Sequence, residues 1–153
     1  MFMRLIPFLV YLVMQFSHVA AESRNNLTNA ITAVDANVVF LRHALAPGYG
    51  DPDNFSLGDC DTQRNLDAKG RQQAIDIGAA IQRSGFRFTQ VFSSEWCRCK
   101  ETTELMKLDK WRIFPGLNSF FQGHVDKQDT IEMLSLKLEA LTKGVTLMVT
   151  HQV

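Results

Sequence analysis

Short apolar runs alternate with longer amphipathic segments along this chain. The strands that they predict lie at residues 38–41, 88–93, 111–114 and 145–150, and the second of these has Val91 and Phe92 as its apolar centre. Uninterrupted apolar runs are typical of strands buried on both faces of a parallel sheet. Because strands alternate with helices, we predict an α/β fold, a three-layer sandwich with a mainly parallel sheet and helices on both faces.

Three amphipathic segments are predicted helices, at residues 67–84, 95–107 and 129–143. Asp67 and Ser94 are the expected N-caps of the first two, and a capping-box pattern at 129–132 opens the third. Small or apolar residues recur at helical spacing in the first and third segments, namely Ala74, Gly78 and Ile81, then Ile131, Leu134, Leu138 and Leu141. A glycine follows each of these two segments as a stop signal.

The start of the chain has the pattern of a secretory signal peptide. A positively charged start precedes a short apolar stretch, and small residues at 19–21 suit cleavage before Glu22. We therefore expect a signal peptide at 1–21, a polar lead-in at 22–36 and one domain at 37–153. Export predicts a periplasmic or secreted protein with no stable membrane span after cleavage, because the apolar run is short for a span. An uncleaved membrane anchor is the alternative.

Composition and charge narrow the partners of the protein. The chain has 153 residues, 46% of them hydrophobic, and its formal net charge at pH 7 is zero. That length suits one domain with a sizeable core. Because the sequence has no block of lysine and arginine, it argues against nucleic acid or an anionic membrane surface as a partner. Any attraction for anions must come from a few residues at one place.

The three cysteines, Cys60, Cys97 and Cys99, are an odd number for an exported protein. One disulfide and one remaining thiol are the simplest expectation in an oxidising compartment. Positions 97 and 99 of one helix point to different faces, so these two cysteines are poorly placed to pair with each other. We predict a disulfide between Cys60 and Cys97, and three unpaired thiols are the alternative.

Two of the predicted strands lead directly into a histidine. His43 follows the first strand and is preceded by Arg42, His151 follows the last strand, and Arg98 lies in the first turn of the second helix. The carboxyl ends of parallel strands meet at one edge of the sheet, where α/β proteins bind ligands. Two imidazoles and two guanidiniums at that edge suit an anion. Taken alone, a solvated Arg42 and a hydrogen-bonded loop His43 would be the simpler interpretation.

The segment 44–66, between the first strand and the first helix, is rich in glycine, proline, aspartate and asparagine. A loop of this length inside a compact domain is uncommon and usually functional. Within it, Gln63 and Arg64 are candidate substrate-binding residues, with a surface turn as the alternative.

Four stretches of the chain resemble motifs of the histidine phosphatase superfamily, in its small, phosphoglycerate mutase-like branch. Residues 41–44 (Leu-Arg-His-Ala) resemble its Arg-His-Gly signature, 65–74 its Leu-Thr-x-x-Gly-x-x-Gln-Ala stretch, 93–102 its Ser-Ser-x-x-x-Arg-x-x-x-Thr stretch, and 149–151 its closing strand and histidine. The stretches follow in family order over nearly the whole mature chain, which makes the resemblance specific. Alanine follows His43 in place of the glycine of the signature, and in this respect the chain resembles exported bacterial members of the superfamily.

This resemblance implies a phosphatase that hydrolyses phosphomonoesters or related phosphoryl compounds through a phosphohistidine on His43. A neutral imidazole can attack phosphorus and divide a difficult displacement into two steps. Arg42, Arg98 and His151 would hold the phosphoryl oxygens, without a metal or cofactor. The alternative is a catalytically weak or inactive phosphate-binding domain of the same fold. A zinc site formed by His43, His124 and His151 is a more distant alternative.

The chain departs from the family pattern in the segment after the arginine helix. Many relatives carry a carboxylate there that protonates the leaving oxygen, whereas residues 115–121 contain none. Loose candidates for this proton donor, each expected to be a solvated polar residue, are Asp51, Glu95, His124 and Asp126.

A second departure is the end of the chain, two residues after His151. Relatives continue with another helix and usually another strand, so we expect a C-terminally truncated domain with an incomplete sheet. An uncovered last strand should expose Val145, Leu147 and Val149 and fray first.

Overall fold

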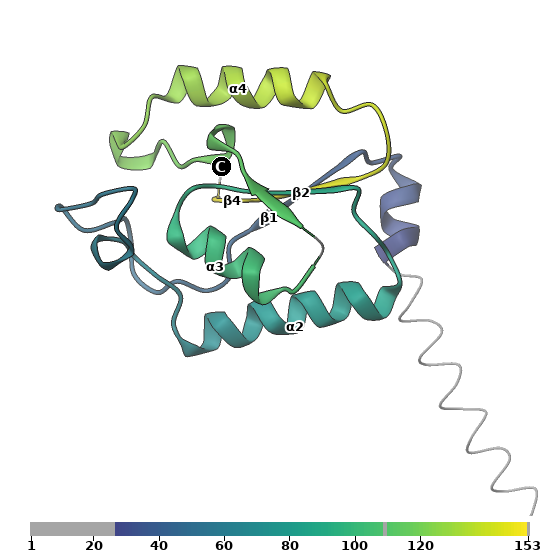
Figure 1. Cartoon of the computed structure of the whole chain (residues 1–153), viewed down its shortest axis with the longest axis horizontal. Helices are drawn as coiled ribbons and strands as arrows, with labels where there is room; N and C mark the ends of the chain where they lie inside the picture. Colours follow the sequence, from purple (N-terminus) through teal and green to yellow (C-terminus); the bar gives the residue numbers. More distant parts are fainter. Residues whose placement is uncertain (1–26, 109, 153) are drawn as a thin grey trace, which may run out of the picture.

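The computed structural model describes residues 27–108 and 110–152, so the predicted signal peptide lies outside the described residues. The strands are β1 (Val38–Arg42), β2 (Gln90–Ser93), β3 (Trp111–Ile113) and β4 (Thr146–Thr150), and the helices are α2 (Ala68–Ser84), α3 (Cys97–Leu105) and α4 (Lys127–Glu139) (Figure 1). Short 3-10 helices form η1 (Cys60–Thr62), η2 (Pro115–Leu117) and η3 (Phe121–Gly123), and residues 27–33 are also helical. Within these described ranges, no helix has the length and apolar character needed to cross a membrane.

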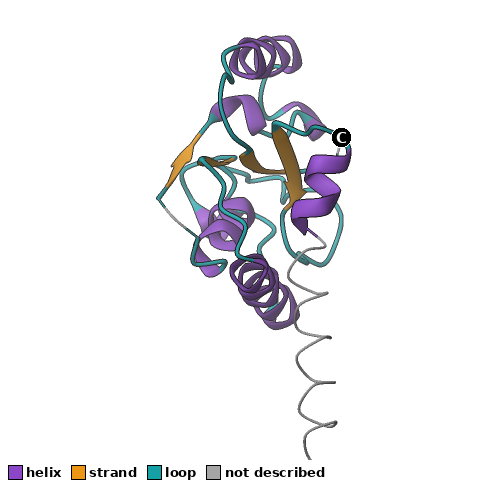
Figure 2. Cartoon of the chain, turned by 90° about the vertical axis from the view of Figure 1, so that its right-hand side faces the viewer, coloured by secondary structure: helices purple, strands orange, loops and turns teal. Residues whose placement is uncertain are grey.

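The sheet has the strand order β1-β4-β2-β3, and every neighbouring pair is parallel. Helix α4 covers one face, and α2 and α3 cover the other, so the predicted three-layer α/β fold is confirmed (Figure 1, Figure 2). The register places Arg42 beside Thr150 and Ser93 beside Val149. Residues that follow β1, β2 and β4 therefore all lie where the strands finish, which is the carboxyl edge of the sheet.

Two apolar clusters fill the spaces between the layers. Successive residues of β2 and β4 face opposite layers, because side chains alternate along a strand. On the α2–α3 side, the cluster consists of Val91, Trp96, Cys99, Met106, Leu147 and Val149. On the α4 side, it consists of Phe92, Leu117 and Met148, packed against Leu134, Leu138 and Leu141.

Strand β1 lies at the edge of the sheet and β4 lies in its interior, contrary to two expectations from the sequence. Phe40 of β1 is exposed, so β1 is not buried on both faces. Leu147 and Val149 of β4 are only 1% and 0% exposed, so the expected exposure of these two residues is wrong. The reason is that β4 lies between β1 and β2, where Trp96, Cys99 and Met106 pack over Leu147 and Val149.

Helix α2 starts and ends as the sequence predicted, whereas α3 starts later. Asp67 caps α2 by accepting a backbone N–H of the first turn at 2.7 Å, and Gly85 ends the helix with a φ of 72°. Helix α3 begins at Cys97, two residues later than predicted. Trp96 is its N-cap residue, so Ser94 is not, although the Ser94 hydroxyl accepts the backbone N–H of Trp96 at 3.3 Å.

Helix α4 starts earlier than predicted. Asp126 is its N-cap and accepts the backbone N–H of Asp129 at 2.9 Å, so the expected capping box at 129–132 is wrong. The helix also ends at Glu139, before the predicted end at residue 143. Ile131 is consequently exposed, while the leucines of the predicted apolar stripe pack into the core.

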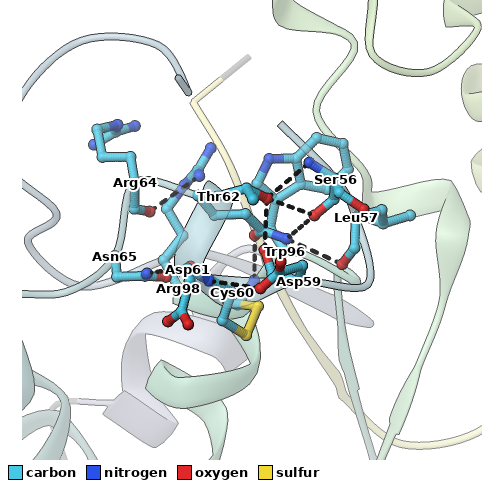
Figure 3. Close-up of a disulfide and its surroundings, with 12 residues drawn as sticks. Ser56, Leu57, Asp59, Cys60, Asp61, Thr62, Arg64, Asn65, Trp96 and Arg98 are labelled. Atoms are coloured by element: carbon cyan, nitrogen blue, oxygen red, sulfur yellow. Dashed lines mark hydrogen bonds between the residues drawn. A yellow bond between two sulfur atoms is a disulfide. The ribbon is translucent and has the colours of Figure 1, made fainter. Parts of the chain in front are cut away.

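The predicted disulfide between Cys60 and Cys97 is present, with the two Cα atoms 5.7 Å apart, and Cys99 is free and buried. It joins the loop 44–66 to the first residue of α3 (Figure 3). Closing a loop of this size stabilises a protein by roughly 3 to 4 kcal/mol in the chain-entropy model. The disulfide therefore holds the loop beside the helix that carries Arg98.

Candidate active site

The structure brings His43, Arg98 and His151 together at the carboxyl edge of the sheet. The two imidazole centroids are 5.4 Å apart. Arg98 lies between them, with its Nε 3.2 Å from Nε2 of His43 and its Nη2 3.4 Å from Nδ1 of His151. These residues are only 6%, 3% and 9% exposed, in the order His43, Arg98 and His151. One guanidinium therefore contacts both imidazoles in a nearly closed site.

The main chain decides which nitrogen of His43 carries the proton. Nδ1 lies 2.7 Å from the carbonyl oxygen of Ala44, which can only accept, so Nδ1 must donate. Nε2 is therefore free of a proton and accepts from Arg98. Burial lowers the pKa of His43 from 6.5 to about 4, opposed by the Ala44 hydrogen bond and helped by the charges of Arg98, Arg42 and Arg64. His43 is neutral at pH 7, with its lone pair on Nε2.

Three hydrogen-bonded residues decide where His151 carries its proton. Asn118 accepts the backbone N–H of Glu95 at 3.0 Å and donates to the Glu95 carboxylate at 2.6 Å, which determines the orientation of its amide. The amide oxygen then accepts from the Ser94 hydroxyl, 3.0 Å away. Because Ser94 has no second proton, Nε2 of His151, 3.0 Å from that hydroxyl, must be the donor.

His151 therefore carries its lone pair on Nδ1, which accepts from Arg98. The Cys99 thiol is consistent with this assignment, because it donates to the carbonyl of Thr150 and leaves its sulfur lone pairs 3.5 Å from Nε2 of His151. Burial, together with the charge of Arg98 and the neighbouring His43, lowers the pKa of His151 from 6.5 to about 2. In the free protein, both imidazoles thus present a lone pair to Arg98.

Asp51 belongs to this cluster, so the expectation that it is a solvated residue is wrong. Its side chain is 4% exposed and pairs with Arg98, with Oδ1 2.7 Å from Nη1 and Oδ2 3.3 Å from Nη2. Burial raises the pKa of Asp51, but hydrogen bonds from Arg98, Arg64 and Trp96 outweigh it and hold the pKa below its ordinary value. An ionised, paired carboxylate is not a proton donor.

Gln63 and Arg64, the candidate substrate-binding residues, make hydrogen bonds within the loop and to the start of α3. The amide nitrogen of Gln63 donates to two loop carbonyls, both at 3.0 Å, and its oxygen accepts the backbone N–H of Cys97 at 2.9 Å. Arg64 donates to the carbonyl oxygens of Gly50, at 2.8 Å, and Ala46. These contacts hold the two ends of the loop together and fasten it to the start of α3.

Arg42 lies at the rim of the site. Its side chain is exposed and has no hydrogen bond or ion pair with any residue that the structure describes, although its charge lowers the pKa of His43. The remaining proton-donor candidates have other partners: Asp126 caps α4, His124 stacks on Phe55 with ring centroids 4.1 Å apart, and Glu95 binds Asn118.

Asp51, Trp96 and Asn118 complete the site, although the sequence pattern placed none of them beside Arg98 or the histidines. Asn118 belongs to the segment 115–121, where the family pattern directs attention to carboxylates alone. Trp96 lies inside the polar arginine motif, and a large apolar residue within such a motif is a signal that could have identified it. Asp51 is among the proton-donor candidates from the sequence, but no local signal places it beside Arg98, because only the fold brings its loop there.

Comparison with known proteins identifies the family. Residues 38–151 match the histidine phosphatase superfamily (branch 1), and the chain belongs to this family. The matched range includes His43, Arg98 and His151. The search of curated proteins found no match.

Solved structures share the fold at low sequence identity. The protein histidine phosphatase SixA complexed with tungstate is 16% identical, with 74% of this chain and 68% of that chain covered and a TM-score of 0.51. A protein of Agrobacterium tumefaciens assigned as phosphohistidine phosphatase SixA is 19% identical, with 75% and 68% covered and a TM-score of 0.53. An Escherichia coli protein assigned as an alpha-ribazole-5'-P phosphatase is 18% identical, with 75% and 73% covered and a TM-score of 0.55. These likenesses establish the fold.

Proposed function

We propose that the protein hydrolyses phosphomonoesters or related phosphoryl compounds through a phosphohistidine on His43. The observation that carries this proposal is a neutral His43 whose Nε2 lone pair faces the guanidinium of Arg98 at 3.2 Å. Membership of the histidine phosphatase superfamily supports a hydrolase of this class. A nucleophile beside a buried cation suits phosphoryl transfer, because the cation stabilises charge on the phosphoryl oxygens.

In the first step, Nε2 of His43 attacks phosphorus, and the bond from phosphorus to the leaving oxygen breaks with its electron pair on that oxygen. Nδ1–H of His43 keeps its hydrogen bond to the Ala44 carbonyl, and this bond stabilises the positive charge that develops on the ring. Arg98 exchanges its two imidazole contacts for phosphoryl oxygens, to which it donates Nε–H and Nη2–H. Water then attacks phosphorus, the P–N bond breaks, and phosphate leaves.

His151 changes its role when the phosphoryl group binds. Its Nδ1 lone pair cannot donate to a phosphoryl oxygen, whereas Nε2–H remains bound to Ser94. Uptake of one proton at Nδ1 makes an imidazolium that donates to the anion. A bound dianion favours this charged form, so the pKa of His151, about 2 in the free protein, rises on binding.

The ionised carboxylate of the cluster cannot protonate the leaving oxygen, and this limits the kinds of ester that the site can hydrolyse. Among the described residues, Asp51 is the carboxylate in contact with Arg98, and it is ionised. General acid catalysis is typically worth ~10²- to 10⁴-fold. We therefore propose that esters with good leaving groups, such as aryl phosphates, react faster than alkyl phosphates.

One observation favours the alternative of a weak or inactive phosphate-binding domain. All five N–H groups of Arg98 have an acceptor inside the protein: the two imidazoles, both oxygens of Asp51 and the carbonyl of Arg64. A phosphoryl group must therefore displace at least two of these contacts, which weakens its binding.

We also propose that the protein acts in the periplasm or as a secreted protein. The Cys60–Cys97 disulfide supports an oxidising compartment. The signal peptide at 1–21, the lead-in at 22–36 and the domain at 37–153 stay predictions from the sequence. We propose a small phosphorylated molecule, rather than nucleic acid, as the partner.

Trapping the phosphoenzyme tests the proposed function. The purified protein is mixed with an aryl phosphate at pH 5 to 7, quenched without acid, and analysed by mass spectrometry for a phosphoryl group on His43. We expect the wild type to form this group and to release phosphate. His43→Ala should form none and should lose about 10⁴- to 10⁶-fold in turnover, as loss of a nucleophile does elsewhere.

His124→Ala serves as the matched control, because His124 stacks on Phe55 and contacts neither Arg98 nor His43. This variant should still form the phosphoenzyme. Turnover retained by pure His43→Ala would exclude His43 as the nucleophile. A wild type that binds inorganic phosphate but never forms the phosphoenzyme would favour the phosphate-binding alternative.

A further inference from the structure

The carboxylate of Asp51 accepts four hydrogen bonds inside the protein. Arg98 donates from Nη1 at 2.7 Å and from Nη2 at 3.3 Å. The backbone N–H of Arg64 and the indole N–H of Trp96 each donate at 3.0 Å. An ionised carboxylate offers about four acceptor positions, so this one is saturated and held in a single orientation.

The guanidinium of Arg98 presents two edges to different groups. Its outer edge, formed by Nη1 and Nη2, faces the carboxylate of Asp51. Its inner edge, formed by Nε and Nη2, faces the ring nitrogens of His43 and His151 at 3.2 and 3.4 Å. The inner contacts go to neutral ring nitrogens, whereas the outer edge binds an anion and has the shortest bond, at 2.7 Å, so the inner contacts are the ones more easily exchanged for phosphoryl oxygens.

We propose that Asp51 is a positioning residue, which holds the outer edge of Arg98 and thereby directs the inner edge toward His43 and His151, where the phosphoryl group binds. This inference rests on the proposed function. Asp51 acts through Arg98 and does not touch the substrate. The ionised carboxylate of Asp51 can hold the planar guanidinium of Arg98 in one orientation. A neutral acceptor with fewer lone pairs cannot do so.

Contacts within the loops hold Asp51 in place before any substrate arrives. The side-chain oxygen of Gln122 accepts the backbone N–H of Asp51 at 2.7 Å, and its amide nitrogen donates to the Asp51 carbonyl at 3.3 Å. Gly50 allows this contact, because its φ is +68° and a Cβ there would lie 2.7 Å from Gln122 Oε1. The disulfide at Cys60 fastens the same loop to α3. Arg98 therefore loses little freedom when it binds a phosphoryl group.

The opposite role for Asp51 is that of an internal competitor, which occupies Arg98 until phosphate displaces it. The two roles predict opposite effects when the charge is removed. If Asp51 positions Arg98, the neutral variant binds phosphate more weakly and turns over more slowly. If Asp51 competes with phosphate, the neutral variant binds phosphate more tightly.

Three variants separate these roles. Asp51→Asn keeps the side-chain shape but places an NH₂ group against hydrogen-bond donors. Trp96→Phe removes one donor to Asp51 and leaves the charge of Asp51 unchanged, and it keeps an aromatic ring at the position that packs against His151. Asp53→Asn is the matched control, because it removes the same charge from an exposed position in the same loop. The measurements are the affinity for inorganic phosphate by calorimetry, kcat and KM with an aryl phosphate, and the NMR signal of the Arg98 Nε–H.

We expect Asp51→Asn to weaken phosphate binding and to lower kcat/KM by about 10- to 100-fold, because a small displacement of a positioning group has effects of this size. Trp96→Phe should change both quantities in the same direction by a smaller factor, and it keeps the test decisive if Asp51→Asn fails to fold. Asp53→Asn should stay within about twofold of wild type. Adding phosphate should shift the Arg98 Nε–H signal in the wild type, whereas folded Asp51→Asn should need a higher phosphate concentration for the same shift.

Phosphate binding that is unchanged or tighter in folded Asp51→Asn, with the Arg98 signal still shifting, would overturn the positioning role. This outcome is distinct from failure of the proposed function. A wild type that binds phosphate without forming the phosphoenzyme refutes the covalent mechanism, and the phosphate affinities of the three variants still decide what Asp51 does.

Discussion

The two strand ends that form the site hold their histidines in different ways. At the end of β1, the carbonyl of the adjacent Ala44 decides the proton position of His43. At the end of β4, Ser94 and Asn118, from two other segments of the chain, decide the proton position of His151. Strand β1 lies at the sheet edge, whereas β4 lies between two strands, so side chains from other segments surround the end of β4.

The difference between these ends matches the different tasks proposed for them. The nucleophile needs one stable tautomer, and a contact to the next residue provides it independently of distant packing. The role proposed for His151 adds a proton at Nδ1 while Nε2–H keeps its bond to Ser94, so the contacts of Ser94 and Asn118 hold the ring in place throughout. Arg98 contacts both ends, so substitutions can be chosen that affect both ends, one end or neither.

Arg98→Lys should disturb both ends together and therefore have a larger effect than a substitution that reaches one end alone. A single ammonium cannot reproduce the planar fork that faces His43, His151 and Asp51. We expect kcat/KM with an aryl phosphate to fall by about 10²- to 10³-fold, as when one donor to a developing anion is lost. Arg112→Lys, on exposed β3, is the control and should keep the wild-type value. Equal kcat/KM in Arg98→Lys and wild type would remove Arg98 from the phosphate site.

Asn118→Leu should disturb only the end of β4. Without the amide oxygen, the Ser94 hydroxyl turns to donate to Nε2 of His151, and the ring proton moves to Nδ1, which then no longer accepts from Arg98. Long-range ¹H–¹⁵N NMR should then show a changed tautomer for His151 and an unchanged one for His43. We expect kcat/KM to fall by about tenfold, a typical loss for a group that orients a site residue.

Asn118→Asp tests whether the acceptor is the feature that matters. It keeps an oxygen for the Ser94 hydroxyl but loses the NH₂ group that donates to Glu95, so Glu95→Gln is combined with it to avoid two facing carboxylates. In this double variant, His151 should keep its proton on Nε2. If Asn118→Leu left the NMR pattern of His151 unchanged, the hydrogen-bonded chain through Ser94 would not control this histidine.

Acidification should have the smallest effect of these changes, because neither histidine of the site titrates between pH 7 and pH 5. Below pH 5 it should distinguish the two histidines by their pKa values. The pKa of His43 is about 4 and that of His151 about 2, both below the ordinary 6.5, because burial disfavours the charged rings. In an NMR titration of the free protein, His43 should therefore protonate first, near pH 4. Protonation of His43 near pH 6.5 would contradict a buried, neutral nucleophile.

The same pKa values predict how stability depends on pH. Between pH 6.5 and 4, the unfolded chain takes up protons on these histidines and the folded protein does not. The free energy of unfolding should consequently fall as the pH falls through this window. Denaturant unfolding at pH 7 and pH 5 measures the change, and His43→Ala should reduce it.

The order of the strands and helices, and the positions of the reactive residues within them, could be predicted from the amino-acid sequence alone. Periodicity distinguishes strands from helices because it depends only on neighbouring residues, and strands that alternate with helices pair in parallel. His43 and His151 could be placed at one edge for the same reason, because the carboxyl ends of parallel strands meet there. The Asp67 cap and the Cys60–Cys97 pairing also followed from local rules and from cysteine number.

The contacts between polar groups at the carboxyl edge of the sheet became visible in the three-dimensional structure alone. Asp51 and Arg98 are 47 positions apart in the chain, and no periodicity relates them. A polar side chain binds whichever partner packing brings within about 3 Å, so composition could not show that Gln63 bonds the loop or that Asn118 controls His151. The burial of β4 depended likewise on strand order, which is set by packing of the whole chain.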